Sequence, residues 1–208
     1  MREMIELLLA TRNRHKTQEF AALLGADFKI SDLTYHANIP APAETGSTYE
    51  ENATLKALAA SRVVAGLVVS DDSGLEVDQL GGGPGIFSAR YAGENARDSD
   101  NIMKLLSELE TQGCEQDVKP ARFVCVLALA EADTILAVFR GMVAGRIVME
   151  PRGLTGFGYD PMFIPDGFDQ TFGELGDEVK NRISHRARAV VQLREYLAGR
   201  FGQLTVAS

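Results

Sequence analysis

The sequence lacks the features of a membrane-bound, secreted or disulfide-rich protein. It has no tryptophan and only two cysteines in 208 residues, and the spacing of Cys114 and Cys125 matches no zinc or redox motif. We therefore expect reduced thiols that take no part in chemistry. No uncharged apolar run approaches the ~20 residues that span a membrane. No signal peptide opens the chain, so we expect a cytoplasmic protein with no membrane partner.

The chain also lacks an excess of positive charge: 29 acidic residues outnumber 21 Lys and Arg, and the formal net charge is −8. Proteins that bind DNA or RNA usually carry the opposite sign, so we expect no nucleic-acid partner. Any anionic ligand must be held by a local cluster of basic side chains and backbone N–H groups. The length and the ordinary composition predict one globular domain over residues 1–208, or two tightly joined lobes that act as one functional unit.

Apolar runs interleaved with amphipathic segments predict an α/β protein with a mixed sheet. Strands are expected at 7–10, 28–33, 67–70, 122–131, 134–139, 142–148 and 162–164, and helices at 16–24, 48–65, 98–110 and after Ser184. Thr48 and Glu51 form a capping box for the second helix, and Gly66 should close it. The last helix should point Val190, Val191, Leu193 and Leu197 inward. The loop at 35–47 is too polar and broken to be core, and a cleft between the lobes is the expected site.

The first candidate for chemistry is the turn between the first strand and the first helix, Thr11-Arg12-Asn13-Arg14-His15-Lys16. A helix N-terminus offers free N–H groups and a favourable dipole to phosphate. The hydroxyl and the amide supply neutral hydrogen bonds, and Lys16 supplies a positive charge. A solvated basic turn is the alternative.

The second candidate is Asp71-Asp72-Ser73-Gly74, which we place at the end of an apolar strand. Adjacent carboxylates repel each other, so they indicate a cation or a basic partner nearby. Mg²⁺ suits this need, since it binds through one or two carboxylates, water and substrate phosphates. Glu44 could reach the same cation, and Lys56, four residues after Asn52 on one helix face, could extend a triphosphate site. The alternatives are an Asp-rich turn, a surface carboxylate and a solvent-facing lysine.

Two later segments could hold the rest of a ligand. In Gly153–Pro161, glycines flank Phe157, so that the backbone can approach a flat ligand while the ring stacks on it; a hairpin loop with a buried Phe is the alternative. Basic side chains then crowd the stretch from Lys180 to Arg188, which indicates an anion site or a salt-bridged helix start.

Taken together, these segments resemble the inosine triphosphate pyrophosphatase family, which removes non-standard purine triphosphates. The resemblance runs from Leu8 to the C-terminal helix. It is carried by Ala10-Thr11-x-Asn13-x-x-Lys16, Glu44-Thr45-Gly46 with Glu51-Asn52-Ala53, Asp71-Asp72-Ser73-Gly74-Leu75 with Pro84-Gly85-Ile86 and Ser88-Ala89-Arg90-Tyr91, and Gly156-Phe157-Gly158-Tyr159-Asp160-Pro161 with Ser184-His185-Arg186.

The resemblance implies a two-lobed α/β fold around a long mixed sheet, a homodimer, and Mg²⁺-dependent hydrolysis of ITP, dITP and XTP to monophosphate and pyrophosphate. It places Thr11, Asn13 and Lys16 on the triphosphate turn, Asp72 as the catalytic base and a metal ligand, Glu44 as a second metal carboxylate, and Ser73 on the substrate. The nucleotide-recognition positions are Phe157, Gly158, Tyr159, Asp160, Lys180, His185 and Arg186. His15 stands where many members carry glycine, and its side chain is expected to crowd the turn.

Base choice would then depend on hydrogen bonding. Backbone N–H groups around 157–160 should donate hydrogen bonds to the C6 oxygen of hypoxanthine or xanthine. Donors from His185 or Arg186 should disfavour the C2 amino group of guanine, which is itself a donor. The remaining alternatives are a pyrophosphatase for modified pyrimidine or a broad range of triphosphates, a nucleotide-binding regulator without turnover, and an RNA-associated protein using the basic cluster at 180–188.

Overall fold

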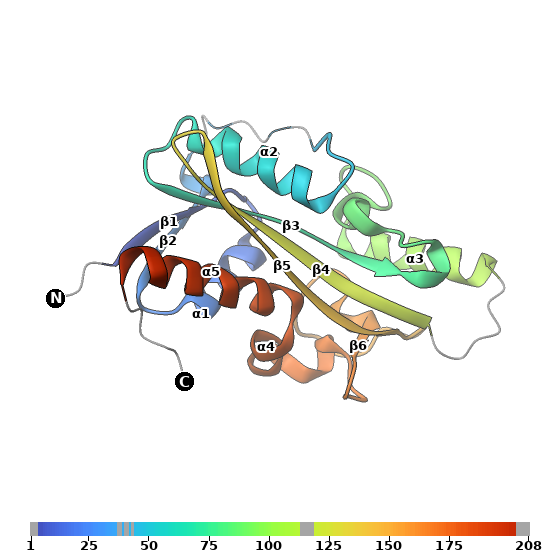
Figure 1. The fold of residues 1–208 in the computed structure, drawn as a ribbon. Helices are drawn as coiled ribbons and strands as arrows, with labels where there is room; N and C mark the ends of the chain where they lie inside the picture. The colour runs from blue at the N-terminus through green and yellow to red at the C-terminus, as the bar shows by residue number, and fades with distance from the viewer. Residues whose placement is uncertain (1–3, 37–38, 40–41, 43, 113–118, 203–208) are drawn as a thin grey trace. The chain divides into compact units, whose positions relative to one another are not determined.

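The computed structural model describes residues 4–36, 39, 42, 44–112 and 119–202, so Cys114 lies outside it. Figure 1 shows the elements along the chain. The strands are β1 (Ile5–Leu9), β2 (Phe28–Asp32), β3 (Leu67–Val77), β4 (Lys119–Glu131), β5 (Thr134–Ile147) and β6 (Phe163–Pro165). The helices are α1 (Arg14–Leu24), α2 (Tyr49–Ser61), α3 (Asp98–Thr111), α4 (Phe172–Ile183) and α5 (His185–Phe201). In the described part of the chain, no helix has the length and apolar character needed to cross a membrane.

The strands form one sheet in the order β2-β1-β3-β4-β5-β6. β1 runs parallel to β2 and to β3, with Leu7 opposite Ile30 on one side and Leu67 on the other. β5 and β6 are antiparallel. This mixture of directions confirms the predicted α/β class with a mixed sheet and flanking helices.

The chain divides into two compact units. The first contains residues 1–72, 125–141 and 186–208, and the second contains 73–124 and 142–185. The N-terminal strand explains how the first unit builds its core, because successive side chains of a strand point to opposite faces. Leu7 and Leu9 pack with residues of α1 and α5, whereas Leu8 and Ala10 pack with Ala60 of α2.

The second unit has its own core of aromatic and branched side chains. Leu105 and Leu109 of α3 pack with Leu75 of β3, Val143 of β5 and Phe172 of α4. Phe123 and Phe163 add a ring pair with centroids 4.7 Å apart. Each unit therefore buries apolar surface of its own, which is the main favourable contribution to folding.

The structure corrects two strand predictions. β3 does not end before the Asp pair but continues through it to Val77, because both carboxylates are buried against basic side chains and Leu75 and Val77 extend the apolar pattern. The strands predicted at 134–139 and 142–148 are one strand, β5. Arg140 does not interrupt it, since it occupies an exposed position between buried Phe139 and Gly141.

Four further predictions were wrong in detail. α2 ends at Ser61 and not near residue 65, since the amide of Val63 donates to the carbonyl of Ala60, three residues back, which departs from the i→i−4 pattern of the helix. Ile39 belongs to the core although its loop is polar. Val191 is 54% exposed, because it is one residue away from the buried Val190 on the helix. Helix α4 was not expected.

Candidate active site

The Thr11 turn is a strand-to-helix connection, as predicted. Asn13 caps α1, because its Oδ1 accepts a hydrogen bond from the backbone N–H of Lys16 at 3.2 Å. The Thr11 hydroxyl oxygen accepts one from the N–H of Asn13 at 3.1 Å. Arg14 and His15 lie exposed in the first turn of the helix. Thr11 and Asn13 thus shape the turn with their own side chains.

Arg12 lies elsewhere than the phosphate-binding prediction implied. Its guanidinium donates to the backbone carbonyls of Ile39, at 2.7 Å, and His36, at 3.3 Å. Both carbonyls belong to the segment after β2. Arg12 therefore ties this segment to the turn, and the part of the turn directed at Asp71 is Lys16.

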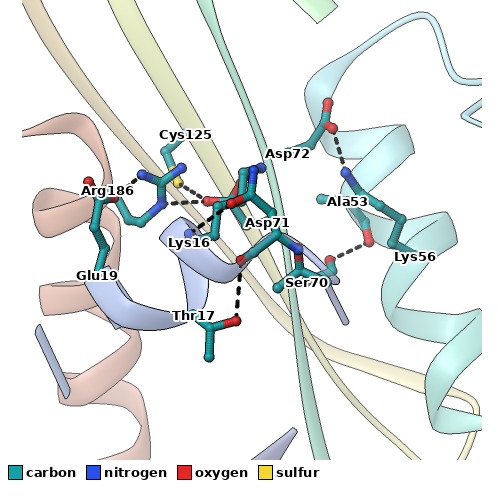
Figure 2. A network of polar contacts seen from close by, with 12 residues as sticks. Lys16, Thr17, Glu19, Ala53, Lys56, Ser70, Asp71, Asp72, Cys125 and Arg186 are labelled. Carbon is teal, nitrogen blue, oxygen red and sulfur yellow. Dashed lines mark hydrogen bonds and ion pairs between the residues drawn. The ribbon is translucent and has the colours of Figure 1, made fainter. Parts of the chain in front are cut away.

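Asp71 is the centre of a buried polar network (Figure 2). One carboxylate oxygen pairs with the Lys16 ammonium, while the other accepts from Arg186 Nε at 2.9 Å and lies 3.3 Å from the Cys125 thiol. Arg186 also pairs with Glu19 of α1. Burial acts to raise the pKa of Asp71, but the charges of Arg186 and Lys16 hold that pKa well below its usual range. Asp71 is therefore ionised and fixed.

Asp72 has a different partner, as the opposite side of Figure 2 shows. Its Oδ1 accepts from Lys56 Nζ at 2.6 Å, and the same nitrogen lies 3.0 Å from Glu44 Oε1. Burial raises the pKa of Asp72, and the Lys56 ammonium offsets part of this rise. Asp72 Oδ2 is buried and has no hydrogen-bond partner among the residues that the structure describes. One oxygen of this carboxylate is thus available for a ligand.

The two neighbouring carboxylates have separate basic partners, which is one of the two arrangements that the sequence indicated for an Asp pair. They are consecutive residues inside β3, so their side chains leave opposite faces of the strand. Asp71 fixes Lys16, and Asp72 faces Glu44 and Lys56. The repulsion that the sequence suggested is avoided by geometry as well as by basic partners.

Helix α2 brings Glu44 to Asp72. Thr48 caps the helix by accepting from the N–H of Glu51. Asn52, fully buried, accepts from the N–H of Gly46 at 2.9 Å. Lys56 lies one turn further along the same face, as its spacing from Asn52 predicts. The helix therefore holds the Glu44–Gly46 segment with one side chain and the Glu44 carboxylate with another.

The recognition segment of the second unit is organised around Asp160. Asp160 Oδ2 accepts from the N–H of Phe157 at 2.8 Å and from Lys180 Nζ at 2.6 Å. The Lys180 nitrogen also lies 4.5 Å from the centre of the Phe157 ring. Gly156 has φ +76, and a Cβ there would lie 2.2 Å from Asp160 Oδ2. Only glycine fits at that position, and the ring and the cation are held together.

The neighbouring amides are already engaged. The N–H of Gly158 donates to Asp98 Oδ2 at 2.6 Å, and that of Asp160 donates to the carbonyl of Phe157. Together with the amide of Phe157, these donors bond within the protein, which corrects the prediction that they face the base. Tyr159 is buried, and its hydroxyl donates to the carbonyl of Ser88 at 2.9 Å. The loop is therefore fixed by its own contacts.

His185 and Arg186 are both buried. The His185 ring stacks on Phe123 with centroids 4.8 Å apart and is 4% exposed. Arg186 is 1% exposed within its ion pairs to Asp71 and Glu19. This placement favours a role for Arg186 in holding carboxylates over direct contact of its guanidinium with a base. Ser73 is half-buried and follows Asp72 on β3.

The described residues contain no cluster of three or more His, Cys, Asp or Glu side chains arranged to hold a metal ion. A carboxylate pair is nevertheless enough for Mg²⁺, which keeps several water ligands and commonly takes the others from substrate phosphates. Glu44 and Asp72 form such a pair, and the side-chain ammonium of Lys56 contacts both carboxylates. The Oδ2 of Asp72, which has no hydrogen-bond partner among the described residues, could serve as a further oxygen ligand.

Sequence reasoning missed Glu19, Asp98 and the neighbourhood of Cys125. Glu19 pairs with a residue 167 positions away, and the Asp98 carboxylate reaches an amide 60 positions away. No local pattern signals such pairs. For Glu19, the one available hint was an acidic residue one turn after Lys16 on the expected helix.

Known proteins resemble this chain over nearly its whole length. The model of the Ham1 family matches residues 7–196. A "dITP/XTP pyrophosphatase" of Bacillus licheniformis is 47% identical over 194 residues, which is 91% of this chain and 96% of that protein. One of Bacillus subtilis is 46% identical over 198 residues, covering 93% and 98%.

Solved structures agree with the sequence relatives. A HAM1 protein from Coxiella burnetii superposes with a TM-score of 0.83 at 40% identity, covering 94% of this chain and 100% of that one. The Staphylococcus aureus Ham1 protein gives 0.81 at 42% identity, covering 94% and 99%. These findings confirm the resemblance drawn from the separate motifs, and the chain belongs to the Ham1 family.

Proposed function

We propose that this protein hydrolyses dITP, XTP and ITP to the nucleoside monophosphate and pyrophosphate, and so clears these nucleotides from the cellular pool. Relatives of 46–47% identity bear the name dITP/XTP pyrophosphatase, and the chain covers nearly all of their length. The observation that carries the proposal is the meeting of Glu44, Lys56 and Asp72, because two carboxylates and a lysine are a set suited to a metal-bound triphosphate.

Glu44 and Asp72 are the residues proposed to hold Mg²⁺. The fit rests on two features: both carboxylates already contact one cation, the Lys56 ammonium, and Asp72 Oδ2 is open. When bound, the ion would neutralise negative charge that develops on the pyrophosphate leaving group.

Asp72 is proposed to orient the attacking water and take its proton. Burial raises the pKa of this carboxyl, which makes it a better base than a solvated aspartate. In the reaction, the water oxygen bonds to the α-phosphorus while the bond from that phosphorus to the bridging oxygen breaks. Pyrophosphate leaves, and the water proton passes to the carboxylate.

The Thr11 turn is proposed to bind the triphosphate. Lys16 supplies a positive charge whose position is set by Asp71, and the N-terminus of α1 supplies N–H groups and its dipole. A fixed charge needs no reorganisation when the substrate arrives, which makes it effective in catalysis. No covalent intermediate is required.

The second unit is proposed to recognise the base. Phe157 provides the stacking face, and Lys180, held by Asp160, keeps the ring in position. Ser73, Gly158, Tyr159 and His185 complete the set of proposed recognition residues. We further propose that both units serve one function, since one family model covers 7–196. We also propose that the enzyme is a homodimer and that it works in the cytoplasm, where its nucleotide substrates are found.

Pyrophosphate release from ITP, dITP, XTP, ATP and GTP, with Mg²⁺ and with EDTA, tests the proposal. We expect turnover of the first three, preference over ATP and GTP of at least about 100-fold, and loss of turnover with EDTA. Asp72→Asn should abolish turnover and keep nucleotide binding within about threefold, since a charge is lost without a change of shape. Equal turnover of all purines, or wild-type rates in the variant, would refute the assignment.

A further inference from the structure

Lys56 lies where a cation shared by Glu44 and Asp72 would bind. Its ammonium nitrogen is 3.0 Å from Glu44 Oε1 and 2.6 Å from Asp72 Oδ1, and its side chain is only 13% exposed. Glu44 and Asp72 side chains are 27% and 8% exposed. Little solvent therefore screens these charges, and the same two carboxylates that suit Mg²⁺ already share a positive partner.

An ammonium ion and a divalent metal compete for such a pair. Mg²⁺ contacts carboxylate oxygens at about 2.0–2.1 Å, much closer than a hydrogen-bonded ammonium nitrogen. Two positive groups on the same two carboxylates would repel each other strongly at this low exposure. Lys56 can leave, because its four-carbon stem is flexible and its ammonium is a compact point charge.

We propose that Lys56 is a resident counterion that occupies the metal position on Glu44 and Asp72 in the free enzyme, and that it moves to the phosphates when a metal–nucleotide complex binds. The inference rests on the proposed function of this carboxylate pair. With Lys56 in this position, metal binding is weak when no nucleotide is present. Metal binding is coupled to nucleotide binding, because a triphosphate offers the displaced ammonium new anionic partners. It also keeps the buried carboxylate of Asp72 and the partly buried carboxylate of Glu44 together before the metal arrives.

Lys16 provides a matched control. It is also a partly buried lysine paired with a β3 aspartate, yet its partner is Asp71 on the opposite face of the strand. Removing either lysine changes the net charge equally, but only Lys56 bridges Glu44 and Asp72. A general charge effect would act through both lysines, whereas displacement acts through Lys56 alone.

The test measures the affinity of the full chain for Mn²⁺ in the absence of nucleotide, with electron paramagnetic resonance as the readout. Lys56→Met should bind Mn²⁺ at least about tenfold more tightly than wild type, and Lys16→Met should change affinity by less than about threefold. Equal tightening in both variants, or none in Lys56→Met, would overturn the proposal. Asp72→Asn should abolish Mn²⁺ binding in the wild type and in both lysine variants.

A second measurement uses the unaltered protein, in case Lys56→Met does not fold. Acetic anhydride labelling read by mass spectrometry should modify Lys56 faster once saturating Mn²⁺ displaces its ammonium, while Lys16 labelling stays constant. Labelling of Lys56 that does not respond to Mn²⁺ would refute displacement. If the wild type binds Mn²⁺ only with nucleotide and Lys56→Met has no higher affinity for Mn²⁺, the resident-counterion proposal is wrong but the proposed metal site still stands. If Asp72→Asn binds Mn²⁺ like wild type, the proposed metal site fails as well.

Discussion

At the scale of single residues, Arg186 is a charged side chain that is buried in the first unit. Its guanidinium is buried and pairs with Asp71 and Glu19. Burying a charge is costly unless it is paired and hydrogen-bonded, and removing one partner leaves the others uncompensated. Arg186 therefore stabilises the carboxylate that in turn fixes Lys16, and its effect on catalysis should pass through that chain.

We expect Arg186→Met to lower the free energy of unfolding by about 3–5 kcal/mol, because the buried Asp71 and the partly buried Glu19 each lose a basic partner. Urea denaturation measures this loss. Asp71→Asn combined with Arg186→Met should cost less than the sum of the single changes. The ratio of ITP to GTP turnover, measured on the folded protein, should stay near wild type. A narrowed ratio with unchanged stability would instead support direct reading of the base by Arg186.

Residue types and spacing were enough to name candidate residues, but not to assign the partners of each. Lys16, Lys56, Asp72 and Glu44 were all predicted, and the structure places them in two groups of ion pairs, Lys16 with Asp71 and Lys56 with Glu44 and Asp72. The pairing of Lys16 with Asp71 joins residues 55 apart, and that of Arg186 with Asp71 joins residues 115 apart. Such contacts depend on the sheet order, which local patterns do not encode.

At the scale of elements, hydrophobic periodicity located most strands and helices. It missed the continuation of β3 through the buried Asp pair, and it missed helix α4. The Asp pair ended the predicted third strand because two adjacent acidic residues rarely continue a buried strand. In the folded chain, basic partners make this continuation favourable. Helix α4 carries the capping box Thr171 and Glu174. That signal was present in the sequence, but the glycines of this segment argued against a helix.

Helix α2 positions Glu44 through a close contact at Gly46. A Cβ on Gly46 would lie 2.7 Å from Asn52 Oδ1 and 2.7 Å from Glu51 Cβ. Gly46→Ala should therefore push the Glu44 segment away from the helix and lower kcat/KM for ITP by about 10- to 100-fold, since small displacements of charged groups are costly in catalysis.

Thr48→Ala is the matched control for this prediction. It removes the N-cap of the same helix and should lower the free energy of unfolding by about 1 kcal/mol. It leaves the contact between Gly46 and Asn52 in place, so kcat/KM at 25 °C should remain near wild type. Equal kinetic losses in both variants would mean that the helix as a whole, and not the Gly46 contact, sets the position of Glu44.

At the scale of the whole molecule, the chain passes repeatedly between its two units. Unit boundaries fall inside β3, β4 and β5, so each of these strands supplies residues to both units. Each unit also has its own hydrophobic core. A strand released from one core cannot easily keep its place in the other. This connectivity favours a single cooperative unfolding transition over two independent ones.

Matched core truncations test this cooperativity. Leu193→Ala in the first core and Leu105→Ala in the second each remove a fully buried leucine and should cost about 2–5 kcal/mol. In hydrogen exchange measured by mass spectrometry, Leu105→Ala should speed exchange of β1, and Leu193→Ala should speed exchange of residues 121–124, each by a factor matching its loss of global stability. If each variant affects only its own unit, and urea unfolding separates into two transitions, the units fold independently despite their shared strands.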